Sequence, residues 1–137
     1  MAETKTVLVN DGGAPARITN FKCGEAIEAG ECLKMHTDGL VMLATDKLVP
    51  IIGFALTDAA SGELVSCISG HGIIINAITD AVTVGDQLSI DAGKPGFLET
   101  ATAYSASAES DKIPALALET NATTDTMTLV MVLYGDK

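Results

Sequence analysis

Two stretches of the 137-residue chain repeat one another and decide the expected fold: Ala26-Ile27-Glu28-Ala29-Gly30-Glu31-Cys32-Leu33-Lys34-Met35 and Ala81-Val82-Thr83-Val84-Gly85-Asp86-Gln87-Leu88-Ser89-Ile90. Each begins with a small residue, carries a glycine followed by an acid, and continues as an alternation of apolar and other residues. Alternation with a period of two is typical of a strand with one buried face. We therefore expect the same turn and strand twice in one chain.

The repetition extends to two halves of similar layout, about residues 26–68 and 81–130. Gly39-Leu40-Val41 recurs as Gly96-Phe97-Leu98 after two extra residues in the turn, and residues 53–68 match residues 115–130. A repeat of this length exceeds the periods of about 20–50 residues found in solenoids. We expect instead a pseudo-twofold β domain, in which two three- or four-stranded halves close on one core that includes Phe54 and Phe97.

The periodicity predicts short strands nearly throughout, separated by turn residues. They are expected at residues 17–23, 32–36, 40–45, 51–57, 64–69, 72–77, 87–90, 113–119 and 127–134. Many short strands at this spacing are typical of a sandwich or barrel. The predicted fold is therefore an all-β, small β-barrel domain over residues 17–137. Residues 101–111, rich in Ala and Ser, form either a helix or an irregular loop.

The first sixteen residues differ from the rest and are predicted to form an extended N-terminal arm. Val7-Leu8-Val9 is expected as an edge strand, which ends where Asn10-Asp11-Gly12-Gly13-Ala14-Pro15 breaks the pattern. A terminal segment of this kind either does nothing specific or orders against a partner. Both alternatives stay open.

Charge and hydropathy exclude two classes of partner. Eight basic and eighteen acidic residues give a net charge of −10, and Arg17 is the only arginine. Nucleic-acid binding needs a concentrated basic patch, which the sequence lacks. The longest apolar runs fall far short of the ~20 residues of a spanning helix, and the N-terminus lacks the layout of a secretory signal. We expect no nucleic-acid or membrane partner and synthesis in a cytoplasm.

The sequence offers little for catalysis. It contains no nucleophile elbow, phosphate-binding loop or His-Glu-x-x-His motif. Cys23, Cys32 and Cys67 lack Cys-x-x-Cys spacing and are expected as buried free thiols. Cys67 and His71 could be drawn as a nucleophile pair, but the glycine-flanked break at His71 should separate them. We expect no catalytic residue, no cofactor and no metal ion.

The repeated Gly–acid step is predicted to be structural. Gly30 and Gly85 are expected where a tight turn needs positive φ. Glu31 and Asp86, which follow them, can accept hydrogen bonds from turn N–H groups. A catalytic carboxylate is rarely duplicated by internal symmetry, so the repetition favours turn stabilisation.

The order of the repeated phrases resembles that of small capsid decoration, or cement, proteins of tailed bacteriophages. The matching phrases lie in residues 27–35, 52–65, 72–77, 82–90 and 113–132, and cover most of residues 17–134. The resemblance implies a β-barrel or β-tulip-like domain on the outer surface of the virion, commonly a homotrimer. It also implies that the major capsid protein is the partner and that the expanded head is stabilised. No catalytic residue is carried over.

A decoration protein needs a surface that binds the shell or a neighbouring subunit. The residues expected on that surface are Val7, Leu8, Val9, Arg17, Ile18 and Phe21. Val7-Leu8-Val9 is suited to adding a strand to a capsid edge. The alternative function is a small β-barrel binding module for host-surface carbohydrate, or a tail or adhesin component, with Tyr104 and Tyr134 in its groove. A third hypothesis is a hydrolase that uses Cys67 and His71.

Overall fold

The computed structural model describes residues 8–10, 17–45, 51–70, 72–91, 93–100, 115–124 and 126–133. The strands in these ranges are β1 Leu8–Asn10, β2 Arg17–Lys22, β3 Cys32–Met35, β4 Val41–Leu43, β5 Ile51–Ala55, β6 Leu64–Ser69, β7 Ile74–Thr79, β8 Gln87–Ile90, β9 Leu98–Thr100, β10 Ala115–Ala117 and β11 Thr126–Val132. The all-β prediction is confirmed. Within the same ranges no helix is long and apolar enough to cross a membrane.

Most expected strands are present with shifted ends. β6 and β8 occupy the expected residues, whereas β7 begins two residues later than Gly72 and continues to Thr79. β9 was not expected, because Leu98-Glu99-Thr100 contains one apolar residue, whereas its counterpart β4, Val41-Met42-Leu43, contains three. Residues 101–111, expected as a helix or a loop, lie outside the described residues.

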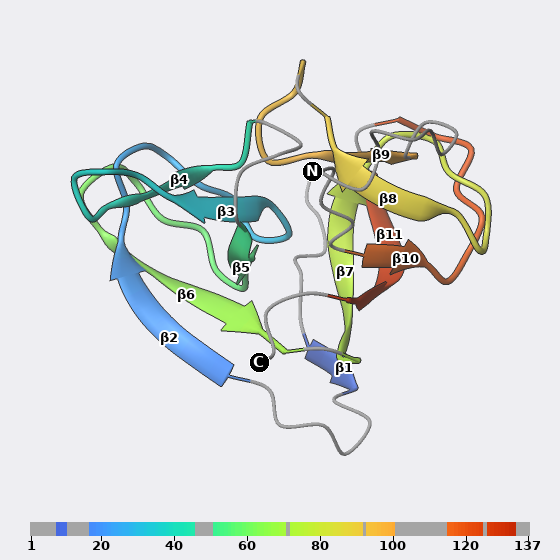
Figure 1. Ribbon diagram of the computed structural model, residues 1–137, viewed down its shortest axis with the longest axis horizontal. Helices are drawn as coiled ribbons and strands as arrows, with labels where there is room; N and C mark the ends of the chain where they lie inside the picture. The colour runs from blue at the N-terminus through green and yellow to red at the C-terminus, as the bar shows by residue number, and fades with distance from the viewer. Residues whose placement is uncertain are drawn as a thin grey trace, which may run out of the picture.

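The strand order is the same in the two halves of the chain (Figure 1). The first half has the order β2-β6-β5-β3-β4, and the second has β7-β11-β10-β8-β9 with β1 added at β7. One parallel bridge then joins the first and last strands of each half, between Cys23 and Val41 and between Thr79 and Leu98. With β2 and β7 included, each half therefore contains five strands. The ranges expected from the sequence, 26–68 and 81–130, contain four each, β3 to β6 and β8 to β11.

The hydrogen bond next to each of these bridges is also the same in the two halves. The Gly24 N–H donates to the Val41 carbonyl at 2.9 Å, as the Asp80 N–H does to the Leu98 carbonyl at 2.9 Å. Residues of β2 thus correspond to residues of β7 with numbers 56 higher, since 80 − 24 = 56. This relation allows the two halves to be compared residue by residue.

Two hydrophobic clusters replace the single core expected from the sequence. The larger cluster joins both halves and includes Phe54, which is fully buried, and Ile68. A smaller one lies within the first half and includes Ala55 and Cys67. Side chains alternate along β5 and β6, so Phe54 and its partner Ile68 enter one cluster while Ala55 and Cys67 enter the other. Phe97, also expected in the core, is only partly buried.

Backbone hydrogen bonds connect the halves at the first Gly–acid turn. The Cys32 N–H donates to the Gly96 carbonyl at 2.9 Å, and the Gly96 N–H donates to the Ala44 carbonyl at 2.8 Å. The Ile78 N–H donates to the Gly30 carbonyl at 3.1 Å. The turn that contains Gly30 is therefore part of the junction between the two halves.

Candidate functional site

The most exposed strand of the first half is β2, which is the end strand of its sheet. Its first four residues are exposed, and Ile18 retains 57% of its accessible surface. Leu64, opposite Lys22 on β6, retains 64%. We call the side of β2 that faces away from β6 the β2 edge. Exposed apolar residues along an open strand edge are typical of a site that binds another chain.

The backbone groups that point out of the β2 edge follow from their neighbours. The Cys23 N–H donates to Glu63, next to β6, whereas the Gly24 N–H donates to Val41 on the opposite side. Because these directions alternate along a strand, the N–H and C=O groups of Ile18, Asn20 and Lys22 point outward. They make no backbone hydrogen bond to another described residue.

The direction in which the backbone groups of Ser66 point supports this assignment. Ser66 lies opposite Asn20, and its carbonyl accepts a hydrogen bond from the Leu56 N–H at 2.8 Å. Its own N–H donates not to β2 but to Oγ1 of Thr57, at 3.2 Å. Both groups point away from β2, so Asn20 and Ser66 form a pair without ladder hydrogen bonds. The backbone groups of Asn20 must then face the open side.

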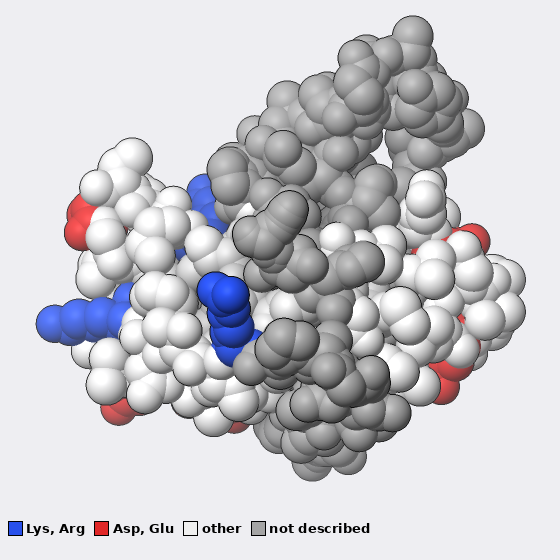
Figure 2. All heavy atoms as spheres, turned by 60° about the horizontal axis from the view of Figure 1, so that its bottom comes forward, with Lys and Arg blue, Asp and Glu red and all other residues white. Residues whose placement is uncertain are grey.

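Basic residues mark both ends of β2. Arg17 begins the strand and Lys22 ends it, and neither forms an ion pair with another residue in the described part of the chain. Lys94, in contrast, pairs with Asp80 at 2.8 Å. Figure 2 shows basic side chains standing out from the left part of the surface, where β2 lies, with acidic ones near the rim. The β2 edge is therefore locally basic in a protein with a net charge of −10.

The structure brings together only some of the predicted contact residues. Arg17 and Ile18 are exposed on β2, while Phe21 is partly buried against the smaller cluster. Leu8 and Val9 lie in β1, which pairs with β7 of the same chain at Leu8 and Ile75. Val7 lies outside the described residues.

Sequence reasoning missed three residues of this surface, namely Asn20, Lys22 and Leu64. Their residue types are ordinary in a strand, and the sequence gives no sign that β2 ends its sheet. Only the pairing of β2 with β6 on one side shows that these residues line an open edge.

The Gly–acid turns have the same geometry in both halves. Gly30 and Gly85 have φ of 95° and 92°. Glu31 accepts a hydrogen bond from the Glu28 N–H at 2.8 Å, and Asp86 accepts one from the Thr83 N–H at 2.9 Å. In each turn the carboxylate thus binds an N–H group three residues earlier, which fixes the turn that precedes the strand.

A third turn of this kind was not singled out from the sequence. Gly62 has a φ of 89°, and Glu63 accepts a hydrogen bond from the Ala60 N–H at 2.9 Å. The Gly62-Glu63 dipeptide was the available signal, but the matching residues of the second half, Thr124 and Asp125, contain no glycine, so the Gly–acid step is not repeated there.

Glu31 differs electrostatically from its counterpart, because it is only 7% exposed and lies near other acids. Burial is the main reason that its pKa is raised from 4.5 to about 7, and the carboxylates of Glu28, Glu25 and Asp58 also raise it. The hydrogen bond from the Glu28 N–H acts in the opposite direction. In the second half, threonines stand where two of these acids stand in the first. Thr83 is the counterpart of Glu28, and Oγ1 of Thr120 accepts a hydrogen bond from the turn as the Asp58 carboxylate does. Fewer negative charges therefore meet at the second turn.

We expect stability to fall as pH rises because of Glu31. Its pKa is higher in the folded protein, so its contribution is fully present below pH 4.5 and is lost as pH rises to about 7. Glu31→Gln keeps an oxygen for the Glu28 N–H and removes the charge. The variant should be more stable than the wild type by roughly 1–3 kcal/mol at pH 8, with little difference at pH 4. Guanidinium unfolding at both pH values measures this.

Asp86→Asn is the matched control, since it makes the same change in the equivalent, partly exposed turn. The control should keep the pH dependence of the wild type. If the stability of Glu31→Gln also kept the pH dependence of the wild type, Glu31 would not be the group responsible for it.

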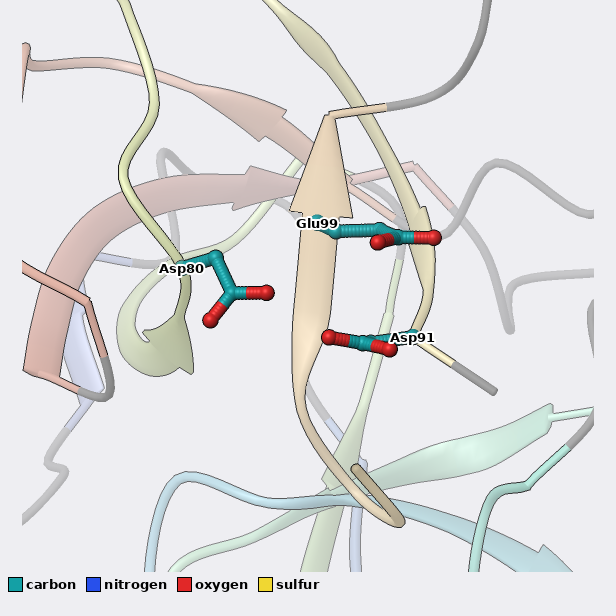
Figure 3. Close-up of side chains that lie close together, drawn as sticks. All are labelled: Asp80, Asp91 and Glu99. Atoms are coloured by element: carbon teal, nitrogen blue, oxygen red, sulfur yellow. The ribbon is translucent and has the colours of Figure 1, made fainter. Parts of the chain in front are cut away.

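Three acids at the β8–β9 hairpin also lie close together. Carboxylate oxygens of Asp80, Asp91 and Glu99 are within 4.8 Å of one another (Figure 3). Asp91 accepts a hydrogen bond from the Gly93 N–H at 2.9 Å, and Lys94 binds Asp80. These contacts satisfy part of the negative charge with the protein's own groups, so proximity alone does not define a metal site. The expected absence of a metal ion stays a prediction.

The cysteines lie in environments that disfavour thiolates. All three are buried and free. Burial raises the pKa of Cys67 to about 12 and that of Cys32 well above its usual value, whereas a nucleophilic cysteine needs a lowered pKa. His71, its supposed partner, lies outside the described residues. The structure thus gives no support for Cys67 as a nucleophile.

Comparison with known proteins defines the class. A family model described as phage cement protein matches residues 16–133, so the chain is a structural protein of a bacteriophage virion. It belongs to the phage cement protein family. Among solved structures it is similar to the head fiber gp8.5 N base of bacteriophage phi29, with a TM-score of 0.64 and 14% identity. That match covers 86% of this chain and 94% of the other, and it shows a shared fold. The comparison with curated proteins gives no match.

Proposed function

We propose that this protein binds the outer surface of the phage capsid and stabilises the expanded head, as a homotrimer without enzyme activity. Its partner is the major capsid protein, and it is made in the host cytoplasm. Membership of the cement family supports this function. The observation in the structure that carries it is the β2 edge, an open strand edge with an exposed Ile18 between Arg17 and Lys22.

The charge of the whole protein fits this location. A net charge of −10 repels the packaged genome, so the protein does not compete for DNA when heads fill or break. Binding in many copies, each a trimer, needs only modest affinity per contact because the linked contacts add avidity. A large apolar interface is therefore unnecessary.

The test is binding to expanded heads that lack this protein. Purified protein should sediment with such heads to a saturating, fixed number of copies and should raise the temperature at which the heads release DNA. Heads mixed with an unrelated acidic protein of similar size serve as control. Absence of binding would contradict the proposal. Light scattering checks the trimer, whose expected mass is three times 14.1 kDa.

No observation in the structure favours the carbohydrate-binding alternative. Tyr104 and Tyr134, the aromatic residues that it would use, lie outside the described residues. The β2 edge offers no exposed ring to stack on a sugar, since Phe21 packs against the smaller hydrophobic cluster.

A further inference from the structure

We propose that the β2 edge binds an extended segment of the capsid shell protein as an added antiparallel strand, with acidic residues near Arg17 and Lys22. This inference rests on the proposed function and names the residues and the contact mode. Its backbone contacts are the outward N–H and C=O groups of Ile18, Asn20 and Lys22.

The second half of the same molecule shows this mode of contact. The Ile73 carbonyl accepts a hydrogen bond from the Val132 N–H of β11, so the backbone groups of Ile74 point to the opposite side of β7. The difference of 56 in numbering makes Ile74 the counterpart of Ile18. At Ile74 the edge is occupied, because Asn10 of β1 pairs there in antiparallel orientation.

Further along β7 the outward groups are also occupied. The Ile78 N–H donates to the Gly30 carbonyl of the first half, and the Asp80 N–H donates to Leu98. Their counterparts in the first half are Lys22 and Gly24, and only Gly24 has a backbone partner among the described residues. The side of the strand that is covered at Ile74 and Ile78 of β7 thus has no backbone partner, within the described ranges, at Ile18 and Lys22 of β2.

The occupant of the β2 edge is neither β1 nor a second β2. In this structure β1 is already paired with β7 of its own chain, where binding is intramolecular. Antiparallel pairing of two β2 strands through these outward groups would place Lys22 of each strand opposite Ile18 of the other, which brings no acid to either basic residue. Such a pair is also a twofold contact, which does not build a closed trimer. A different chain therefore fits best.

Charge and exposure define the chemistry of the segment. Arg17 and Lys22 are separated by about 17 Å along an extended strand, so the segment has about six residues. Because neither has an ion-pair partner among the residues that the structure describes, their charges favour acids at both ends of the segment. The exposed Ile18 favours an apolar residue beside it, on the face that Asn20 and Lys22 share. Main-chain hydrogen bonds then supply affinity, as in other cases of strand addition.

The backbone contact at Asn20 is tested by comparing how strongly two variants, Asn20→Pro and Asn20→Ala, bind to heads. Proline removes the outward N–H of Asn20 and leaves the ladder to β6 intact, as is tolerated at an edge strand. Both variants lose the hydrogen bond of the Asn20 side chain with Ser66 Oγ, which is 2.9 Å long. With expanded heads lacking the protein as the probe, we expect Asn20→Pro to bind about tenfold or more weakly than Asn20→Ala.

Hydrogen exchange of the wild type provides a readout that does not depend on a variant folding. Amides of Ile18, Asn20 and Lys22 should exchange fast in the free protein and become protected on heads. Those of Thr19 and Phe21, which face β6, should be protected in both states. The double variant Arg17→Glu, Lys22→Glu should also weaken binding, by about tenfold or more at low salt.

The outcomes separate the two proposals. Wild-type protein that does not bind heads overturns the proposed function and this inference together. Wild-type binding without new protection of Ile18, Asn20 and Lys22, or equal binding by Asn20→Pro and Asn20→Ala, overturns this inference alone. Protection that is already present in the free protein and disappears on dilution identifies a second copy as the occupant and also overturns it.

Discussion

Gly53→Ala is expected to lower the free energy of unfolding by about 3 kcal/mol or more, a large fraction of the stability of a domain of this size. Gly53 lies in β5, between β3 and β6, with a φ of 149° that other residues rarely adopt. A Cβ built there would overlap the Ile68 carbonyl oxygen and lie 2.7 Å from the Cys67 Sγ. The obstacle is backbone of the neighbouring strand, which cannot move without breaking the β5–β6 pairing.

A bulge in β5 explains why a glycine occupies this position. The register between β3 and β5 shifts next to Gly53, where β5 carries an additional residue. A bulge of this kind bends the strand and often requires glycine. Here the absence of a side chain at Gly53 lets β5 approach the backbone of β6 at Ile68.

Gly39→Ala is the matched control. Gly39 has a φ of 88°, but a Cβ there has no neighbour within 4 Å. The control should cost only about 1 kcal/mol, from the backbone conformation alone. Guanidinium unfolding of both variants measures the difference. Equal losses in the two variants would show that close approach to β6 is not what requires glycine at Gly53.

Phe54→Ala is expected to destabilise both halves together, by roughly 3–5 kcal/mol. Phe54 is fully buried in the cluster that also contains Leu88, Ala115 and Val130 of the second half. Removing its ring leaves a cavity against residues of both sheets. Hydrogen exchange should therefore accelerate in β8 and β10 as much as in β5.

The control for this variant is Val84→Ala, at an apolar residue that is exposed in the second half. It should change stability by less than about 0.5 kcal/mol, because little surface is buried there. If Phe54→Ala instead left β8 with the exchange rates of the wild type, the two halves would be independent folding units, against the predicted single domain.

Local pattern was sufficient where a strand is several residues long and has one buried face. β6 and β8 lie where alternation placed them, because burial of one face requires a period of two in the sequence itself. β9 was missed although β4, its counterpart of the same length, was expected, because only one of the three residues of β9 is apolar. The second hydrophobic cluster was missed because β5 and β6 bury both faces, which a sequence of small and apolar residues does not distinguish from one buried face.

The candidate site was predicted in part. Arg17 and Ile18 were expected at a contact surface and lie exposed on β2, while Leu8 and Val9 pair within the chain. Nothing local marks Asn20 or Lys22 as residues of an open edge. Whether a strand ends its sheet depends on which distant segment pairs with its other side, and β1 happens to take that place at β7 and not at β2.

The sequence by itself determined the β class and the positions of the Gly–acid turns, because both depend on residues close together in the chain. It also determined the family, through the order of the repeated phrases along the chain. The tertiary structure alone decided which half keeps an open strand edge and which acid is buried among others. Glu31 and Asp86 occupy equivalent turns with similar hydrogen bonds, yet only Glu31 lies at the junction of the halves with other carboxylates nearby. Desolvation and charge–charge repulsion act through space, so residues far apart in the sequence set their size.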